Sequence, residues 1–179
     1  TLEQAPSIVT VFRREDIDRL QVHQLVDLLK FVPGFYEVAA QLGRNVAVRG
    51  IHATSAQHFM VLLDGQVMND FLTSTASPDA FPLDYAERVE ILRGPASSIY
   101  GASALMAVVN IITHANAEVR PAKLRLSYGT DNTVRASASA MADLGRDRTV
   151  AITGTFWSSA GSRALVNGGE DVLWPTQGQ

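Results

Sequence analysis

The sequence predicts an α+β fold followed by antiparallel strands. Three observations support this: short β-prone runs close on Gly, Pro or Asp-Gly, one stretch has leucines at helical spacing, and apolar and polar residues alternate from residue 122. A linker-like composition at residues 117–122 separates the two patterns. Two domains are therefore expected, residues 1–117 and residues 118–179.

The first domain is expected to begin with a strand and two helical segments. Ser7–Phe12 is β-prone, and Ile17 and Leu20 lie one helical turn apart. A stripe at i, i+3, i+4 follows, formed by Leu25, Leu28 and Leu29. That helix is expected to stop at residues 32–34, Val-Pro-Gly, because proline disfavours a helical conformation in the residue before it.

Strands separated by loops complete the first domain. The expected strands are residues 46–51, 59–63, 89–92 and 108–113. Asp64-Gly65 predicts a hairpin turn after the second strand, and Pro95 ends the third by barring ladder pairing. Polar, small-residue loops span 52–58 and 68–82, and the second is long enough to suggest a functional loop.

Three alternating runs make up the second domain. They cover residues 122–128, 134–142 and 150–157, each with one apolar and one polar face. The pattern is typical of transmembrane barrel strands, and equally of an ordinary antiparallel sheet with one solvated face. Residues 158–179 are predicted to be loop without a regular element.

Composition excludes several functions. The net charge of −3 argues against a nucleic-acid partner, and no run is long and apolar enough for a membrane helix. The absence of cysteine excludes disulfides and thiol catalysis for this sequence. No metal site is expected, since no two histidines have i, i+4 spacing and surface positions explain all four: His23, His52, His58 and His114.

Catalytic patterns are weak. The glycines at 94 and 101 do not have phosphate-loop spacing and no lysine follows, and no G-x-S-x-G elbow occurs. Asp64, Glu87 and Glu90 leave a hydrolase open as a remote alternative.

Arg49 and Arg93 are distinctive charges, because each is expected to end a strand immediately before a glycine within apolar sequence. A buried arginine requires carboxylate partners. A local pair with Glu87 or Glu90 is one solution.

Residues 88–101, RVEILRGPASSIYG, together with VVNIIT at 108–113, resemble the plug domain of TonB-dependent outer-membrane receptors. The preceding motifs follow in the order of that family: REDI at 14–17, VPG at 32–34, VRG at 48–50 and VLLDG at 61–65. The resemblance implies a plug-type domain with a small mixed β-sheet and short helices, followed by the first strands of a transmembrane barrel.

The resemblance implies that the chain is the plug of such a receptor, the part that gates it and recognises the ligand. The receptor would take up a scarce nutrient actively, such as an iron-siderophore, haem or cobalamin. The resemblance implies that the chain is not an enzyme and has no cofactor. It also implies that the receptor lies in the bacterial outer membrane. The implied partners are the nutrient chelate, the rest of the barrel, and TonB through a box that this sequence lacks. A soluble periplasmic plug-like binding module without a barrel is the alternative.

The resemblance also assigns roles to residues. Ligand contacts are placed in two loops, at His52, Thr54, Ser55, Gln57, Met68, Asn69, Phe71 and Thr73. A charge latch between plug and barrel is assigned to Arg49, Arg93 and Glu90. The remaining motif residues are Gly94, Pro95, Tyr100, Gly101 and Asn110. The chain departs from the family where Leu105-Met106-Ala107 replace a small-Gly-Gly step. Its open strand edges predict self-association through the barrel strands.

Overall fold

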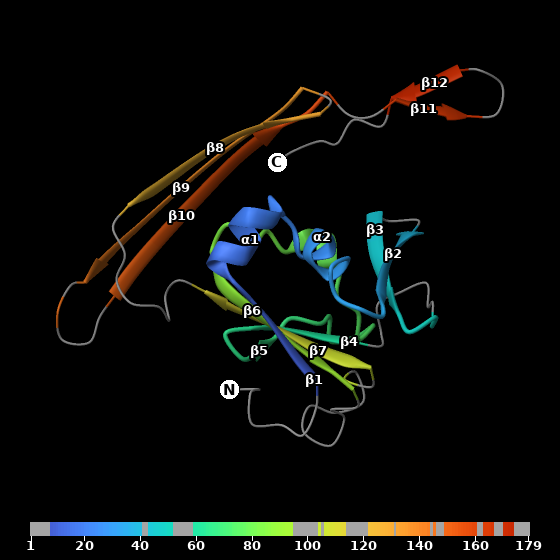
Figure 1. The fold of residues 1–179 in the computed structure, drawn as a ribbon, viewed down its shortest axis with the longest axis horizontal. Helices are drawn as coiled ribbons and strands as arrows, with labels where there is room; N and C mark the ends of the chain where they lie inside the picture. The colour runs from blue at the N-terminus through green and yellow to red at the C-terminus, as the bar shows by residue number, and fades with distance from the viewer. Residues whose placement is uncertain are drawn as a thin grey trace. The chain divides into compact units, whose positions relative to one another are not determined.

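The computed structural model divides the chain into two compact units, Thr1–Ala117 and Glu118–Gln179. Figure 1 shows the helices and strands of both units. The structure describes residues 8–40, 43–51, 59–94, 104, 106–113, 122–130, 132–143, 145, 149–160, 163–166 and 170–173.

The first unit is built on a mixed five-stranded sheet. Its order is β1 (Ile8–Arg13), β6 (Ala86–Arg93), β7 (Ala107–Thr113), β4 (Phe59–Leu63) and β5 (Gln66–Val67). The β4 and β7 strands run parallel, and the other neighbours are antiparallel (Figure 1). The mixed sheet and its short helices confirm the predicted fold class.

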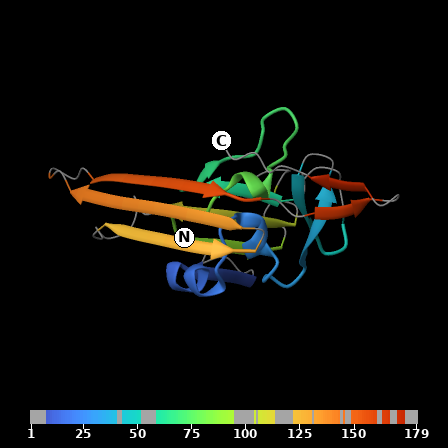
Figure 2. The ribbon, with the colours of Figure 1, turned by 90° about the horizontal axis from the view of Figure 1, so that it is seen from above.

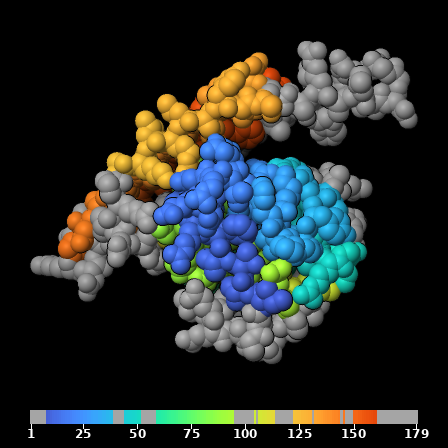
Figure 3. Space-filling model, viewed as in Figure 1, coloured from blue at the N-terminus to red at the C-terminus, as the bar shows by residue number. Residues whose placement is uncertain are grey.

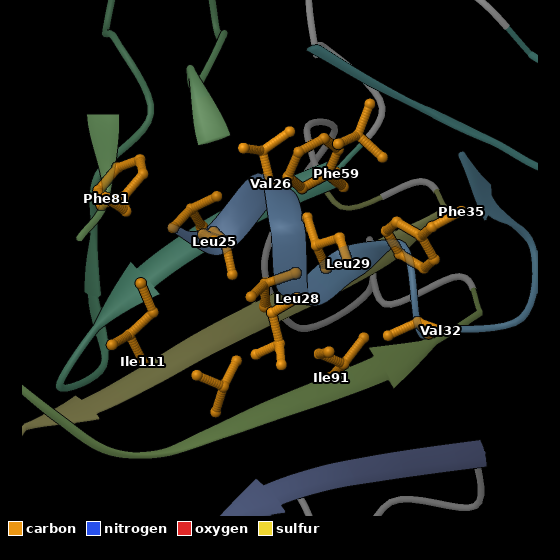
Figure 4. Close-up of a cluster of buried hydrophobic side chains, with 14 of the residues drawn as sticks. Leu25, Val26, Leu28, Leu29, Val32, Phe35, Phe59, Phe81, Ile91 and Ile111 are labelled. Carbon is orange, nitrogen blue, oxygen red and sulfur yellow. The ribbon is translucent and has the colours of Figure 1, made fainter. Parts of the chain in front are cut away.

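Two short helices, α1 (Arg14–Leu20) and α2 (Leu25–Leu29), contribute to the main core on one face of this sheet. The leucine stripe of α2 is fully buried and points toward Ile91 and Ile111 of the strands (Figure 4). A short 3-10 turn, η2 (Pro78–Ala80), also contacts α2. Burying several such side chains at about 1.5–3 kcal/mol each provides most of the driving force for folding.

The other face of the sheet carries a smaller cluster of five buried side chains, Met60, Leu62, Leu92, Ala104 and Val108. Strand residues alternate between the two clusters, as the pleat requires. Strands that are buried on both faces have mostly apolar residues at successive positions. This explains why residues 61–63 and 108–112 show no alternation of apolar and polar residues.

A separate antiparallel hairpin is formed by β2 (Phe35–Ala40) and β3 (Gly43–Val48). The sequence predicted the second strand to reach residue 51. It ends at Val48 because Arg49 and Gly50 adopt the left-handed conformation, with φ of 53° and 81°. The space-filling view shows the hairpin beside the helices (Figure 3).

The second unit contains three long antiparallel strands, β8 (Lys123–Gly129), β9 (Thr133–Asp143) and β10 (Thr149–Ser158), in the order β10-β9-β8. Figure 2 shows them side by side. A fourth and a fifth strand, β11 (Arg163–Val166) and β12 (Glu170–Leu173), form a further hairpin. The prediction that residues 158–179 lack regular structure was therefore wrong, because two short runs within this range pair as antiparallel strands.

Candidate functional site

The Asp64-Gly65 turn is fixed by two residues of β7. Asp64 accepts hydrogen bonds from the backbone N–H and the hydroxyl of Thr113, at 2.9 and 2.7 Å. The Gly65 N–H donates to Asn110 Oδ1 at 3.2 Å. Both turn residues have positive φ, 49° and 83°. Asn110 and Asp64 therefore hold the turn between β4 and β5, and the loop that follows β5 begins at Met68.

Asn69 ties the same loop to the outer edge of β4. Its Oδ1 accepts from the Val61 N–H at 2.8 Å, and its Nδ2 donates to the carbonyls of Phe59 and Ser74 at 3.2 and 3.1 Å. An amide side chain that satisfies three backbone groups substitutes for a missing strand partner. Asn69 thus has an internal, positioning role.

Asp70 organises the tip of the loop. Its Oδ1 accepts from the N–H groups of Leu72 and Thr73 and from the Thr73 hydroxyl, at 3.0, 2.8 and 2.8 Å. The backbone hydrogen bond from Thr73, followed by the bond from its hydroxyl, lowers the pKa of Asp70 below its ordinary value. The carboxylate is therefore committed to the turn.

These bonds present two apolar side chains to solvent. Phe71 is 96% exposed and Leu72 is 88% exposed, and Met68 is also exposed. Of the residues predicted for this loop, Met68 and Phe71 face solvent, whereas Asn69 bonds to β4 and to Ser74, and Thr73 bonds within the loop. Leu72 was not predicted, since a leucine is ordinarily assigned to a core. The other predicted contacts, His52, Thr54, Ser55 and Gln57, lie outside the described residues.

Arg49 and Arg93 meet at one turn, formed by Pro33 and Gly34. The Arg49 N–H donates to the Gly34 carbonyl at 2.7 Å, and Arg93 Nη1 approaches the Pro33 carbonyl at 3.5 Å. The Arg93 Nε is buried without a hydrogen-bond partner. No carboxylate among the described residues forms a salt bridge with either arginine.

Glu90 lies on the opposite face of the sheet from Arg93, because residues three apart in a strand point to opposite sides. It accepts a hydrogen bond from Arg88 Nε at 2.8 Å, and its Oε2 is buried without a partner. The local Arg93–Glu90 pair considered from the sequence is therefore not formed.

The remaining motif residues are partly described. Gly94 has a φ of 140°, a conformation that favours glycine, and its N–H donates to the Met106 carbonyl at 2.9 Å. Pro95, Tyr100 and Gly101 lie outside the described residues. Within the described part, no three His, Cys, Asp or Glu side chains group as a metal site.

The second unit has one strongly apolar face. The register places Leu126, Ala136 and Phe156 in one row across β8, β9 and β10. Leu126 is 72% exposed and Phe156 is 65% exposed. Arg125, Ser137 and Thr155 share a row on the other face, so the predicted alternation is present in the folded strands. No helix in the described ranges is long and apolar enough to cross a membrane.

Comparison with known families and structures gives a consistent result. A family model described as TonB-dependent receptor plug domain matches residues 1–108. The ferripyoverdine receptor of the outer membrane of Pseudomonas aeruginosa has a TM-score of 0.71 at 19% identity, over 87% of this chain and 21% of that chain. The siderophore receptor PirA from Acinetobacter baumannii has a TM-score of 0.71 at 22% identity, over 93% and 26%.

The ferric-catecholate import receptor Fiu from E. coli K12 has a TM-score of 0.69 at 21% identity, over 92% of this chain and 23% of that chain. At these identities the likeness concerns the fold. The chain spans about a fifth to a quarter of the length of these solved receptors.

Proposed function

Because this chain belongs to the family of TonB-dependent receptor plug domains, we propose that it is the plug of an outer-membrane receptor, gating it and recognising a scarce nutrient for active uptake. The family match carries the proposal. The solved proteins with this fold are described as a ferripyoverdine receptor, a ferric-catecholate import receptor and a siderophore receptor, which favours an iron-siderophore over haem or cobalamin. TonB is the expected energy-coupling partner.

Plug domains of this family are parts of transporters and not enzymes. Two of the carboxylates considered for hydrolysis, Asp64 and Glu90, accept hydrogen bonds from neighbouring residues of the fold. Asp64 is bonded to Thr113 at the base of the hairpin, and Glu90 is bonded to Arg88 on the sheet.

We propose that the second unit is the start of the barrel wall. The solved receptors align with about 90% of the chain, whereas the first unit holds 117 of the 179 residues, so the alignment extends beyond that unit. The exposed apolar face of β8, β9 and β10 is suited to lipid. This observation favours the receptor over a soluble periplasmic module.

The ligand contact is proposed at the loop between β5 and η2, through Phe71, Leu72 and Met68. A fixed loop with an apolar tip binds without the entropic cost of ordering. Equilibrium binding to the chain is the test, with a ferric tris-catecholate, a ferric hydroxamate, haemin and cyanocobalamin as probes. We expect an iron-siderophore to bind and Phe71→Ala to weaken it at least about tenfold. Binding of haemin or cyanocobalamin alone would overturn the choice of nutrient.

Arg49 and Arg93 are proposed as the latch to the barrel, since Arg93 has an unpartnered buried Nε and neither has a described carboxylate partner. Glu90 is a weaker candidate for the latch because it already accepts a hydrogen bond from Arg88. In the receptor that contains this chain, Arg93→Ala is expected to increase sensitivity to a large antibiotic. Unchanged sensitivity of the double Arg49→Ala/Arg93→Ala variant would contradict the latch.

A further inference from the structure

The β2–β3 hairpin has its own backbone hydrogen-bond ladder. Among the described residues its other backbone–backbone bonds reach only adjoining turns: Phe35 N–H to Val32 O at 3.0 Å, Arg49 N–H to Gly34 O at 2.7 Å, and Val48 N–H to Ile51 O at 3.3 Å. No described ladder bond joins it to the five-stranded sheet. Side chains therefore hold the hairpin in place.

The inner face of the hairpin changes character along its length. At its base, Phe35 and Val48 lie opposite each other and are buried, and the Phe35 ring meets Phe59 edge to face at 6.3 Å. Val46 is buried on the same face, opposite Glu37. Arg44 follows on that face, two residues further toward the tip. The base is apolar and the outer part is charged.

Arg44 joins three elements through hydrogen bonds. It donates to Glu37 Oε1 and Oε2 on β2, at 2.6 and 3.1 Å, and to Asp27 Oδ1 on α2. A longer bond of 3.4 Å reaches Gln24 at the start of α2. Its backbone N–H donates to Asp79 Oδ2 on η2 at 3.2 Å.

Lys30 completes the group, with Nζ 3.0 Å from Asp27 and 3.1 Å from Glu37. We call Asp27, Lys30, Glu37 and Arg44 the Arg44 clasp. The hydrogen bond from Arg44 lowers the pKa of Glu37 to about 2, so this carboxylate is charged at neutral pH. Asp79 is the remaining charged group facing the hairpin from η2.

We propose that the Arg44 clasp controls whether the outer part of the β2–β3 hairpin, described at Val38–Ala40 and Gly43–Asn45, lies against α2 or swings away from it. The inner half stays anchored by the buried Phe35 and Val48. The clasp is partly exposed and is therefore weakened by water and salt, whereas the apolar anchor is not. Opening requires no break in the five-stranded sheet.

Amide hydrogen exchange of the 179-residue chain tests the proposal by comparing Arg44→Ala with the unmodified chain. We expect at least about tenfold faster exchange at residues 38–40 and 43–45 and unchanged exchange at residues 86–93 and 107–113. Glu37→Gln, which keeps the side-chain shape, should give a smaller increase at the same residues. Arg19→Ala is the matched control, since the Arg19 side chain is 79% exposed and lies 4.0 Å from its salt-bridge partner Asp16.

Two results would overturn the proposal. One is exchange at residues 38–40 and 43–45 that neither Arg44→Ala nor Glu37→Gln changes relative to Arg19→Ala. The other is acceleration of the β6 and β7 amides in parallel with the hairpin, which would make the clasp a general stabiliser. If Arg44→Ala fails to fold, Glu37→Gln alone decides between these outcomes.

Discussion

At the scale of single residues, the most consequential side chain is Arg14, which is buried at the start of α1. Its Nη1 donates to the carbonyls of Leu83 and Ala86 at 2.6 and 2.9 Å, and Nε donates to Asp18 at 2.9 Å. It thereby ties α1 to the turn that begins β6. The REDI motif at 14–17, which is part of the family resemblance, therefore also supplies this long-range contact.

Arg14→Ala is expected to lower the free energy of unfolding by about 3 kcal/mol, because two buried carbonyls lose their donor. Urea denaturation followed by circular dichroism measures the change. Arg19→Ala should stay within about 0.5 kcal/mol of the unmodified chain, as a surface residue. A small effect for Arg14→Ala would show that water replaces the guanidinium.

Asn69 and Phe71 have opposite roles within one loop. Asn69→Ala should cost about 1–3 kcal/mol in unfolding free energy, because it leaves backbone groups of β4 unpaired. Phe71→Ala should change stability by less than about 0.5 kcal/mol, since the ring touches little else. Thermal denaturation of both variants provides the comparison. Equal losses would mean that Phe71 packs against the loop.

At the scale of elements, the hairpin shows how opposing effects set a pKa. Burial is the largest single influence on the pKa of Asp27 and raises it. The hydrogen bonds from Arg44 and Lys30, together with the charges of these two residues, outweigh burial, so the pKa of Asp27 is lowered overall. For Glu37 the hydrogen bond from Arg44 is the largest influence. Both carboxylates therefore favour the folded state when ionised.

The pH dependence follows from these directions. The pKa of Glu37 is about 2 in the folded state against an ordinary value of 4.5, so its contribution to stability is complete above pH 4.5 and is lost as the pH falls toward 2. Urea midpoints of the unmodified chain should fall across this window more steeply than those of Glu37→Gln. Parallel slopes for the two proteins would refute the assignment.

At the scale of the whole molecule, the second unit presents apolar rows, and β8 and β10 are the edge strands of its three-stranded sheet as far as the described residues show. Such surfaces are paired or covered in stable proteins. Their exposure is what the start of a barrel wall requires, and it is a liability for an isolated chain in water.

Light scattering on a size-exclusion column without detergent should therefore find a defined dimer or larger species for residues 1–179. Removal of residues 121–179 should restore a monomer, and Leu126→Glu with Phe156→Glu should reduce association in the intact chain. A monomeric intact chain would instead favour the soluble plug-like module.

Much of the fold could be predicted from local patterns. The leucine stripe of α2, the Asp64-Gly65 turn and the alternation in β8 to β10 each encode one element. The pair β11–β12 was not predicted because its strands are only four residues long. The strand β2 was not predicted as a separate element because Glu37 interrupts its apolar residues.

The candidate site was less accessible to prediction. From its residue type alone, Leu72 would be expected in the core. Its exposure depends on the hydrogen bonds that Asp70 accepts within the turn. The separation of Arg93 from Glu90 was encoded by strand parity, whereas the meeting of Arg49 with Arg93 at Pro33 and Gly34 was not.

The sequence by itself determined the helices, most strands, the tight turns and the family, because these depend on spacing within short stretches and on motifs in a fixed order. Only the tertiary structure decided the parallel pairing of β4 with β7, the burial of Arg14 and the partners of Arg44. The physical reason is the same in each case. These contacts join residues distant in sequence, and their geometry exists only once the chain has packed.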